Sequence, residues 1–232
     1  MPSTPDLEIL RNPSSNDFFV LDIDSTLVTT YQRNQAILDE FITTKKEQFP
    51  EDCLNLKQAQ CQLGDYGLKT GLERIKFKET APGLSQLLQD YWRKNFFSNN
   101  FLSADRPAEG AVEWVQYLKT FGVDFIYLTA RHKDTMWEGT LSSLKDLGFP
   151  ISEKNLFLKE DLRDNDEGYK TKLLGQIIAK KKQNIWFIDN EPTVLNEISK
   201  DHPKVNLIWF ESTHSGKATP PEGITSIKSF IF

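Results

Sequence analysis

The sequence predicts an α/β fold in which buried parallel strands alternate with helices, and in which a mainly helical insertion follows the first strand. Short apolar runs, such as residues 18–21, have the composition of strands that are buried on both faces. Segments with apolar residues at helical spacing separate most of these runs. Residues 29–104 contain several helical segments and no convincing strand.

The composition is that of an ordinary globular protein. The 232 residues are 38% hydrophobic and 26% charged, with a net charge of -5. An acidic chain without a basic stripe favours no nucleic-acid partner. No apolar run reaches membrane-spanning length and the first residues lack a secretory pattern, so we expect a cytoplasmic protein without membrane contacts. Cys53 and Cys61 would lie about 12 Å apart on one helix, too far for a disulfide, which favours reduced thiols.

The first predicted strand ends in two carboxylates, Asp22 and Asp24. Acids at the carboxyl end of a buried strand repel each other and lose hydration, so a bound cation or a reaction is the best reason for them. A magnesium ion prefers hard oxygen ligands, which a carboxylate and a nearby backbone carbonyl supply. The alternative is an acidic turn that is capped by Ser25 or Thr26.

The segment that follows predicts a separate helical unit. Apolar residues recur at helical spacing in 31–48 and 84–97, and glycines interrupt the region between them. We expect residues 1–29 and 105–232 to form the α/β core, and residues 30–104 to form a small helical domain. The alternative is that these helices only enlarge the core.

The chain is expected to return to the core near Pro107, which suits the first turn of a helix that ends at Gly122. An apolar strand follows at 123–128 and leads into Thr129, Ala130 and Arg131. A hydroxyl and backbone amides at this end of a strand can hold phosphoryl oxygens. Thr129 alone is better explained as a helix cap, and Arg131 suits an anionic substrate and a local acid equally well.

Two lysines open a later helix. Apolar residues between 173 and 178 form one helical face, which places Lys170 and Lys172 near the helix N-terminus. Positive charge is unfavourable there unless an anion lies beside it. Lys170 and Lys172 are therefore both candidates for an anion-binding residue. An apolar strand at 184–188 then delivers Asp189 to its carboxyl end, and Pro192 begins the next helix.

These groups, in this order, resemble the four signatures of the haloacid dehalogenase (HAD) superfamily of phosphohydrolases. The matching residues are Asp22, Asp24 and Thr26, then Thr129, then Lys170, then Asp189. The resemblance implies a Rossmann-like parallel sheet as the HAD core. It also implies that the helical segment is a cap, inserted between the first and second signatures, which covers the active site.

The resemblance also implies a function, that of a magnesium-dependent phosphatase acting on a small phosphomonoester. Asp22 would attack phosphorus to form an aspartyl-phosphate, and Asp24 would act as general acid and then as general base. Mg²⁺ would be held by Asp22, the backbone carbonyl of Asp24 and Asp189. The phosphoryl group would be bound by Thr129, Ala130 and Lys170.

The fourth signature departs from the commoner forms, because Asn190 stands where a second aspartate often follows. Asn190 or Glu191 therefore acts on the metal directly, through water, or only as a helix cap. This departure supports an alternative function, a low-activity or inactive HAD-fold protein that uses the cap for protein interaction. The sequence identifies no protein partner.

Overall fold

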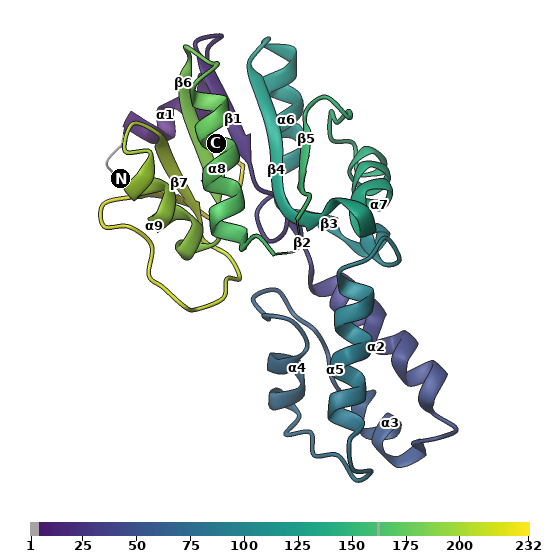
Figure 1. The fold of residues 1–232 in the computed structure, drawn as a ribbon. Coiled ribbons are helices and arrows are strands. Elements are labelled where there is room, and N and C mark those ends of the chain that lie inside the picture. Colours follow the sequence, from purple (N-terminus) through teal and green to yellow (C-terminus); the bar gives the residue numbers. More distant parts are fainter. Residues whose placement is uncertain (1–4, 162) are drawn as a thin grey trace.

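The computed structural model describes residues 5–161 and 163–232, and a parallel six-stranded sheet forms its centre (Figure 1). The strands lie in the order β5-β4-β1-β6-β7-β8, and every neighbouring pair is parallel. Their bounds are β1 (Asp17–Leu21), β4 (Asp124–His132), β5 (Leu156–Lys159), β6 (Asn184–Asp189), β7 (Asn206–Phe210) and β8 (Thr225–Ile227). The predicted α/β fold with a Rossmann-like parallel sheet is confirmed.

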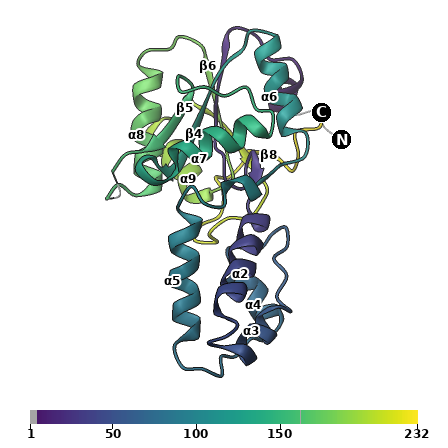
Figure 2. The same cartoon turned by 90° about the vertical axis from the view of Figure 1, so that its right-hand side faces the viewer.

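Helices cover both faces of the sheet, and α6 and α8 lie on opposite sides of it (Figure 2). The strands alternate their side chains, so Phe19 and Leu21 pack into one core cluster while Phe18 and Val20 pack into the other. The first cluster includes side chains of α1 (Pro5–Arg11), α6 (Ala111–Thr120) and α7 (Lys133–Asp146). The second includes side chains of α8 (Asp166–Ile178) and α9 (Pro192–Asp201). Burial on both faces explains the continuous apolar runs in the sequence.

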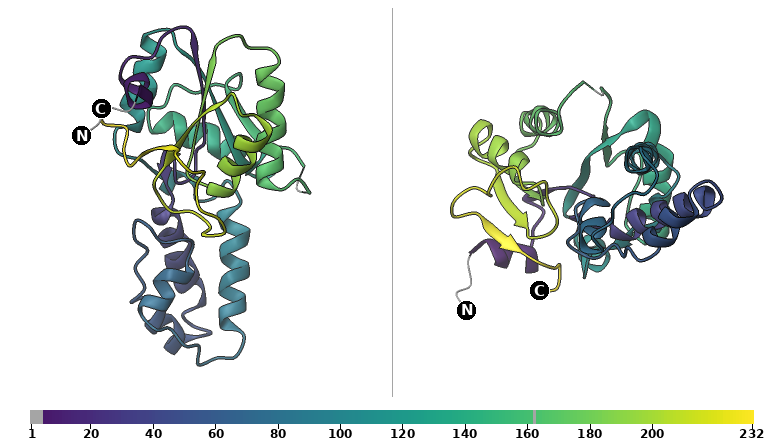
Figure 3. Two further views of the ribbon diagram at one scale, coloured as in Figure 1. Left: turned by 90° about the vertical axis from the view of Figure 1, so that its left-hand side faces the viewer. Right: turned by 90° about the horizontal axis from the view of Figure 1, so that it is seen from below.

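A group of helices projects below the carboxyl ends of the strands (Figure 1). We call it the helical unit; it comprises α2 (Tyr31–Lys45), α3 (Pro50–Leu56), α4 (Lys69–Arg74) and α5 (Leu84–Phe96). The unit has its own hydrophobic cluster, which includes Leu38, Phe41 and Leu88. Seen from below, it lies under the half of the core that contains β4 and α7, and it leaves the α9 side uncovered (Figure 3).

Two short strands connect the helical unit to the core. β2 (Val28–Thr29) precedes α2, and β3 (Arg106–Pro107) follows the 3-10 helix η1 (Leu102–Ala104). β2 and β3 pair antiparallel, so the chain leaves and re-enters the core at one place. The division at residues 30 and 104 stays a prediction. No helix among the described residues is long and apolar enough to cross a membrane.

Three local expectations were wrong. Pro107 pairs with Val28 in β3 and does not begin a helix; α6 begins at Ala111, after Gly110 with φ +75°. The two lysines do not open their helix: α8 begins earlier, at Asp166, because Asn165 caps it by accepting a hydrogen bond from the backbone N–H of Gly168. The helix of Cys53 ends at Leu56, so Cys61 does not share it; both cysteines are buried, free thiols.

Candidate active site

Three neighbouring strands place the predicted site residues at one edge of the sheet. Leu21 of β1 pairs with Ile188 of β6, and the backbone N–H of Asp22 donates to the Ile188 carbonyl at 3.0 Å. The carboxylates of Asp22 and Asp189 therefore leave the sheet from adjacent strands. On the other side, Leu21 pairs with Tyr127, so Thr129 lies two residues further along β4, toward the same edge.

Lys170 joins the two carboxylates. Its Nζ donates to Asp22 Oδ1 at 2.6 Å and to Asp189 Oδ2 at 2.7 Å. All three residues are at least 96% buried, since their exposed fractions are 4% for Asp22 and Lys170 and 0% for Asp189. Lys172, by contrast, is exposed and makes no contact with these carboxylates. Of the two candidate lysines, Lys170 is therefore the one beside the acids, from the second turn of α8.

The electrostatics of this group favour a further cation. Burial raises the pKa of Asp22 to about 7; Lys170 opposes this rise and the Asp189 carboxylate adds to it. The pKa of Asp189 is also raised, chiefly by burial. Burial alone would lower the pKa of Lys170, but the two carboxylates outweigh it and hold the pKa above its usual range. One ammonium thus faces two buried carboxylates, which leaves negative charge for a cation to compensate.

Polar neighbours complete the surroundings of Asp22. The Thr26 hydroxyl donates to Asp22 Oδ2 at 2.8 Å and lies 3.3 Å from Asn190 Oδ1. Asn190 Nδ2 donates to the carbonyl of Thr213, which fixes the amide. Glu191 points elsewhere: it caps α9 and accepts from the backbone N–H of Ser215 at 2.8 Å. Of the two residues left open by the sequence, Asn190 is the one near Asp22.

These donors fit Mg²⁺ by type. Among the described residues there is no group of three or more His, Cys, Asp or Glu that could hold a metal ion. Asp22 and Asp189 supply two carboxylates and Asn190 an amide oxygen, and magnesium characteristically takes one or two protein carboxylates while it keeps several waters. The observation that supports a cation here is geometric: the two buried carboxylates share one ammonium, at 2.6 and 2.7 Å.

Asp24 lies in a separate group of charges, which we call the ionic cluster: Asp24, Arg33, Asp105 and Arg131. Arg131 binds Asp24 with two donors, Nε to Oδ2 and Nη2 to Oδ1, both at 2.8 Å. Arg33 Nη2 donates to Asp24 Oδ1 at 2.6 Å. Both Nη2 groups also donate to Asp105 Oδ2, at 2.5 Å from Arg33 and 2.8 Å from Arg131. Arg131 thus pairs with local acids.

The arginines determine the charge of Asp24. Burial would raise the pKa of Asp24, but the guanidinium groups of Arg131 and Arg33 outweigh it and hold the pKa well below its usual range. Asp24 is therefore ionised in this arrangement. The sequence analysis missed Arg33 and Asp105. Arg33, Ile37 and Phe41 are buried at i, i+4 spacing on α2, so an arginine in the apolar stripe was the available signal.

The predicted phosphate-binding segment has a compact local structure. Thr129 is 1% exposed, and its hydroxyl oxygen accepts from the backbone N–H of Arg131 at 3.2 Å. Ala130 lies between them and is partly exposed. Among residues 5–161 and 163–232 no acceptor is found for the Thr129 hydroxyl hydrogen, which leaves it as a donor.

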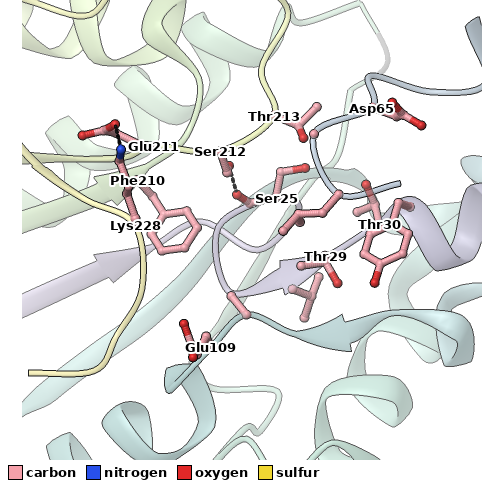
Figure 4. A pocket seen from close by; sticks show the side chains of 15 residues that line it. Ser25, Thr29, Thr30, Asp65, Glu109, Phe210, Glu211, Ser212, Thr213 and Lys228 are labelled. Atoms are coloured by element: carbon pink, nitrogen blue, oxygen red, sulfur yellow. Dashed lines mark hydrogen bonds and ion pairs between the residues drawn. The ribbon is translucent and has the colours of Figure 1, made fainter. Parts of the chain in front are cut away.

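A cavity of about 420 Å³ lies beside the site (Figure 4). Its lining combines Ser25, Thr29 of β2 and Thr30 before α2 with Asp65, between α3 and α4, and with Ser212 and Thr213 after β7. The Ser212 hydroxyl donates to the carbonyl of Ser25, as the dashed line in Figure 4 indicates. None of the predicted site residues lines this cavity. The buried carboxylates and Lys170, and not the cavity, therefore define the candidate active site.

No family model matches the sequence, and a search of curated proteins finds no match. Solved structures do match. A HAD-superfamily hydrolase of subfamily IA from Geobacter sulfurreducens is 14% identical, with 94% of this chain and 95% of that chain covered and a TM-score of 0.55. CbbY from Rhodobacter sphaeroides, in complex with phosphate, is 12% identical, with 93% and 94% covered and a TM-score of 0.52.

A third match is the HAD-hydrolase YfnB from Bacillus subtilis, bound to magnesium. It is 13% identical, with 93% of this chain and 95% of that chain covered and a TM-score of 0.51. Matches of near-complete length at such low identity establish the fold. The chain therefore has the fold of the HAD-superfamily hydrolases, and the resemblance that its sequence motifs predict is confirmed at that level.

Proposed function

We propose that the protein is a magnesium-dependent phosphatase that hydrolyses a small phosphomonoester through an aspartyl-phosphate at Asp22. The contact of the Lys170 ammonium with both Asp22 and Asp189 is the observation that carries the proposal. A buried ammonium between two acids at a sheet edge is costly to build, and such buried charge groups are concentrated at functional sites. The magnesium-bound and phosphate-bound structures with this fold support the same reading.

In the first step, Asp22 attacks phosphorus, an Asp22 O–P bond forms, and the bond from phosphorus to the ester oxygen breaks. Thr129, the backbone amide of Ala130 and Lys170 stabilise charge on the remaining phosphoryl oxygens. Mg²⁺, held by Asp22, the backbone carbonyl of Asp24 and Asp189, with Asn190 nearby, would supply positive charge against the phosphoryl oxygens. Each of these groups lies on or directly after β1, β4, β6 or α8.

Asp24 acts on protons in both steps. It donates to the ester oxygen as that oxygen leaves, and it takes a proton from the water that hydrolyses the aspartyl-phosphate. The ionised form favoured by Arg33 and Arg131 suits the second step. Donation in the first step requires Asp24 to separate from these guanidinium groups, so leaving groups that depart without a proton are the better substrates.

The contacts of Arg33 and Arg131 with Asp24 also favour a second function. A carboxylate engaged by two arginines suits a HAD-fold binding or regulatory protein with little turnover, which would use the helical unit for protein interaction. A panel of sugar phosphates, nucleotides and phosphopeptides separates the two functions, because only the phosphatase releases inorganic phosphate. We further propose a cytoplasmic location and no nucleic-acid or membrane partner.

Substitution of Asp22 by asparagine tests the nucleophile. Asp22→Asn should abolish magnesium-dependent phosphate release from 4-nitrophenyl phosphate, because the amide cannot form the aspartyl-phosphate. The circular dichroism spectrum should not change, since asparagine has almost the same shape. Lys172→Ala, on the exposed side of α8, is the matched control and should retain activity. Undiminished turnover in Asp22→Asn would refute the proposal.

A further inference from the structure

Arg33 is the only member of the ionic cluster that the helical unit contributes. It lies in the first turn of α2, and its side chain is 0% exposed. Asp24 follows β1, Arg131 lies in β4, and Asp105 precedes β3. Arg33 thus connects α2 to both the core and the segment by which the chain returns to it.

The helical unit fixes Arg33 from a second side. The Arg33 guanidinium lies 4.5 Å from the centre of the Phe96 ring, and its Nη1 donates to the Phe96 carbonyl at 3.4 Å. Phe96 is the last residue of α5. A guanidinium that stacks on an aromatic ring and donates in fixed directions has little freedom. The position of the Arg33 guanidinium therefore depends on how α2 and α5 pack against each other.

Arg33 and Arg131 occupy the two oxygens of Asp24 unequally. Oδ1 accepts from both Nη2 groups, at 2.6 Å from Arg33 and 2.8 Å from Arg131. In the part of the chain that the structure describes, Oδ2 accepts only from Arg131 Nε, at 2.8 Å. A carboxylate oxygen has two acceptor directions, so one on Oδ2 is free. The Asp24 side chain is 29% exposed, which gives water access to the carboxylate.

We infer that Arg33 is a positioning residue through which the docked helical unit orients Asp24 as the general base. The inference rests on the proposed function. Arg33 and Arg131 saturate Oδ1, so Oδ2 takes the proton of the attacking water. The water oxygen bonds to phosphorus, the bond from phosphorus to the Asp22 oxygen breaks, and inorganic phosphate and the Asp22 carboxylate result. Asp24 then releases its proton to solvent.

The kinetics of Arg33→Met with 4-nitrophenyl phosphate test this role. This leaving group needs no proton, so formation of the aspartyl-phosphate should be unaffected and kcat/KM should stay within about twofold. Hydrolysis of the intermediate should slow, and kcat should fall about 10- to 100-fold, the range expected for a misplaced reacting group. One equivalent of 4-nitrophenolate should appear as a burst. A purely structural role for Arg33 would lower kcat/KM as well.

The kinetics of Asp24→Asn are the second test of this role. It should give the same burst and a kcat reduced about 10²- to 10⁴-fold, as for loss of a general base. Arg33→Met should cause no further loss in the Asp24→Asn protein, because its effect passes through Asp24. Multiplicative losses would overturn the inference. Arg74→Met is the matched control, since Arg74 pairs with Asp65 within the helical unit, and it should keep the wild-type kcat and KM.

A balanced variant covers the case in which Arg33→Met does not fold. Loss of Arg33 leaves the two carboxylates of Asp24 and Asp105 with one arginine. The double variant Arg33→Met with Asp105→Asn keeps one carboxylate and one guanidinium in the ionic cluster, so their charges balance. The double variant should show the same burst and the same unchanged kcat/KM, and equal reductions in both parameters would overturn the inference. A wild-type protein without turnover would instead refute the proposed phosphatase function.

Discussion

At the scale of single residues, the candidate site is stabilised because its buried charges of opposite sign lie in contact. Lys170 is buried with two acids, and its ammonium is stabilised only because Asp22 and Asp189 lie at 2.6 and 2.7 Å. The residue was predicted from its position before an apolar helical face, but the physical reason was incomplete. α8 begins at Asp166, so Lys170 lies in the second turn, where carboxylates of two strands compensate its charge more than the helix dipole opposes it.

Substitution of Lys170 gives a residue-scale prediction. Lys170→Met should lower kcat for 4-nitrophenyl phosphate about 10²- to 10³-fold, the usual cost of losing a charged donor to the transition state. Lys172→Met should leave kcat unchanged, because Lys172 is exposed on the same helix. Steady-state kinetics of both variants, with thermal unfolding to verify their folding, checks the prediction. A larger loss for Lys172→Met would reassign the third signature.

At the scale of elements, the apolar strands were predictable because burial on both faces leaves a continuous run in the sequence. The short strands β2 and β3 were not. Each has two residues, and they form only because Val28, before the helical unit in the sequence, pairs with Pro107, after it. The start of α6 was missed for a related reason: Pro107 suits both a first helical turn and a strand edge, and the pairing with β2 decides between them.

Two glycines at the ends of α6 allow an element-scale prediction. Gly110 and Gly122 have φ of +75° and +69°, so alanine at either position costs about 1–2 kcal/mol of backbone strain. A Cβ at Gly110 would also lie 2.8 Å from the carbonyl carbon of Phe230, whereas one at Gly122 has no atom within 4 Å. Gly110→Ala should therefore destabilise the protein more, by about 1–3 kcal/mol beyond Gly122→Ala.

Urea unfolding of the two variants, followed by far-ultraviolet circular dichroism, measures this difference. The contact at Gly110 holds the C-terminal segment, since the backbone N–H of Phe230 donates to the Glu109 carbonyl at 2.8 Å. Equal free energies of unfolding for Gly110→Ala and Gly122→Ala would mean that this segment moves aside without cost.

At the scale of the whole molecule, the sequence predicted which strand ends hold the candidate site residues but not how the helical unit contacts them. Asp22 follows β1, Asp189 is the last residue of β6 and Thr129 lies near the end of β4, and a parallel sheet brings such strand ends together whatever the intervening chain. Arg33 and Asp105 are 72 positions apart and meet only in the folded protein. The apolar stripe around Arg33 indicates that this arginine is buried but not which acids it pairs with, and nothing in the sequence near Asp105 distinguishes it from a surface charge, so the ionic cluster required the tertiary structure.

Magnesium should stabilise the whole fold if the buried acids bind it. A ligand that binds only the native state adds about 2.7 kcal/mol to the free energy of unfolding at 100 times its dissociation constant. For a chain of this size, about 1 kcal/mol raises Tm by about 2–4 °C, so saturating MgCl₂ should raise Tm by several degrees. Asp189→Asn should lose most of this rise, because one of the two carboxylates that face Lys170 becomes neutral.

The control for this measurement is Asp201→Asn, an exposed acid at the end of α9, which should keep the full magnesium response. NaCl at matched ionic strength separates site binding from general screening, since screening acts on all surface charges alike. An identical rise in Tm for the wild type and Asp189→Asn would show that magnesium binds away from β1 and β6. The negative charge of Asp22 and Asp189 would then be compensated by Lys170 alone, and the phosphoryl site would have to work without the ion.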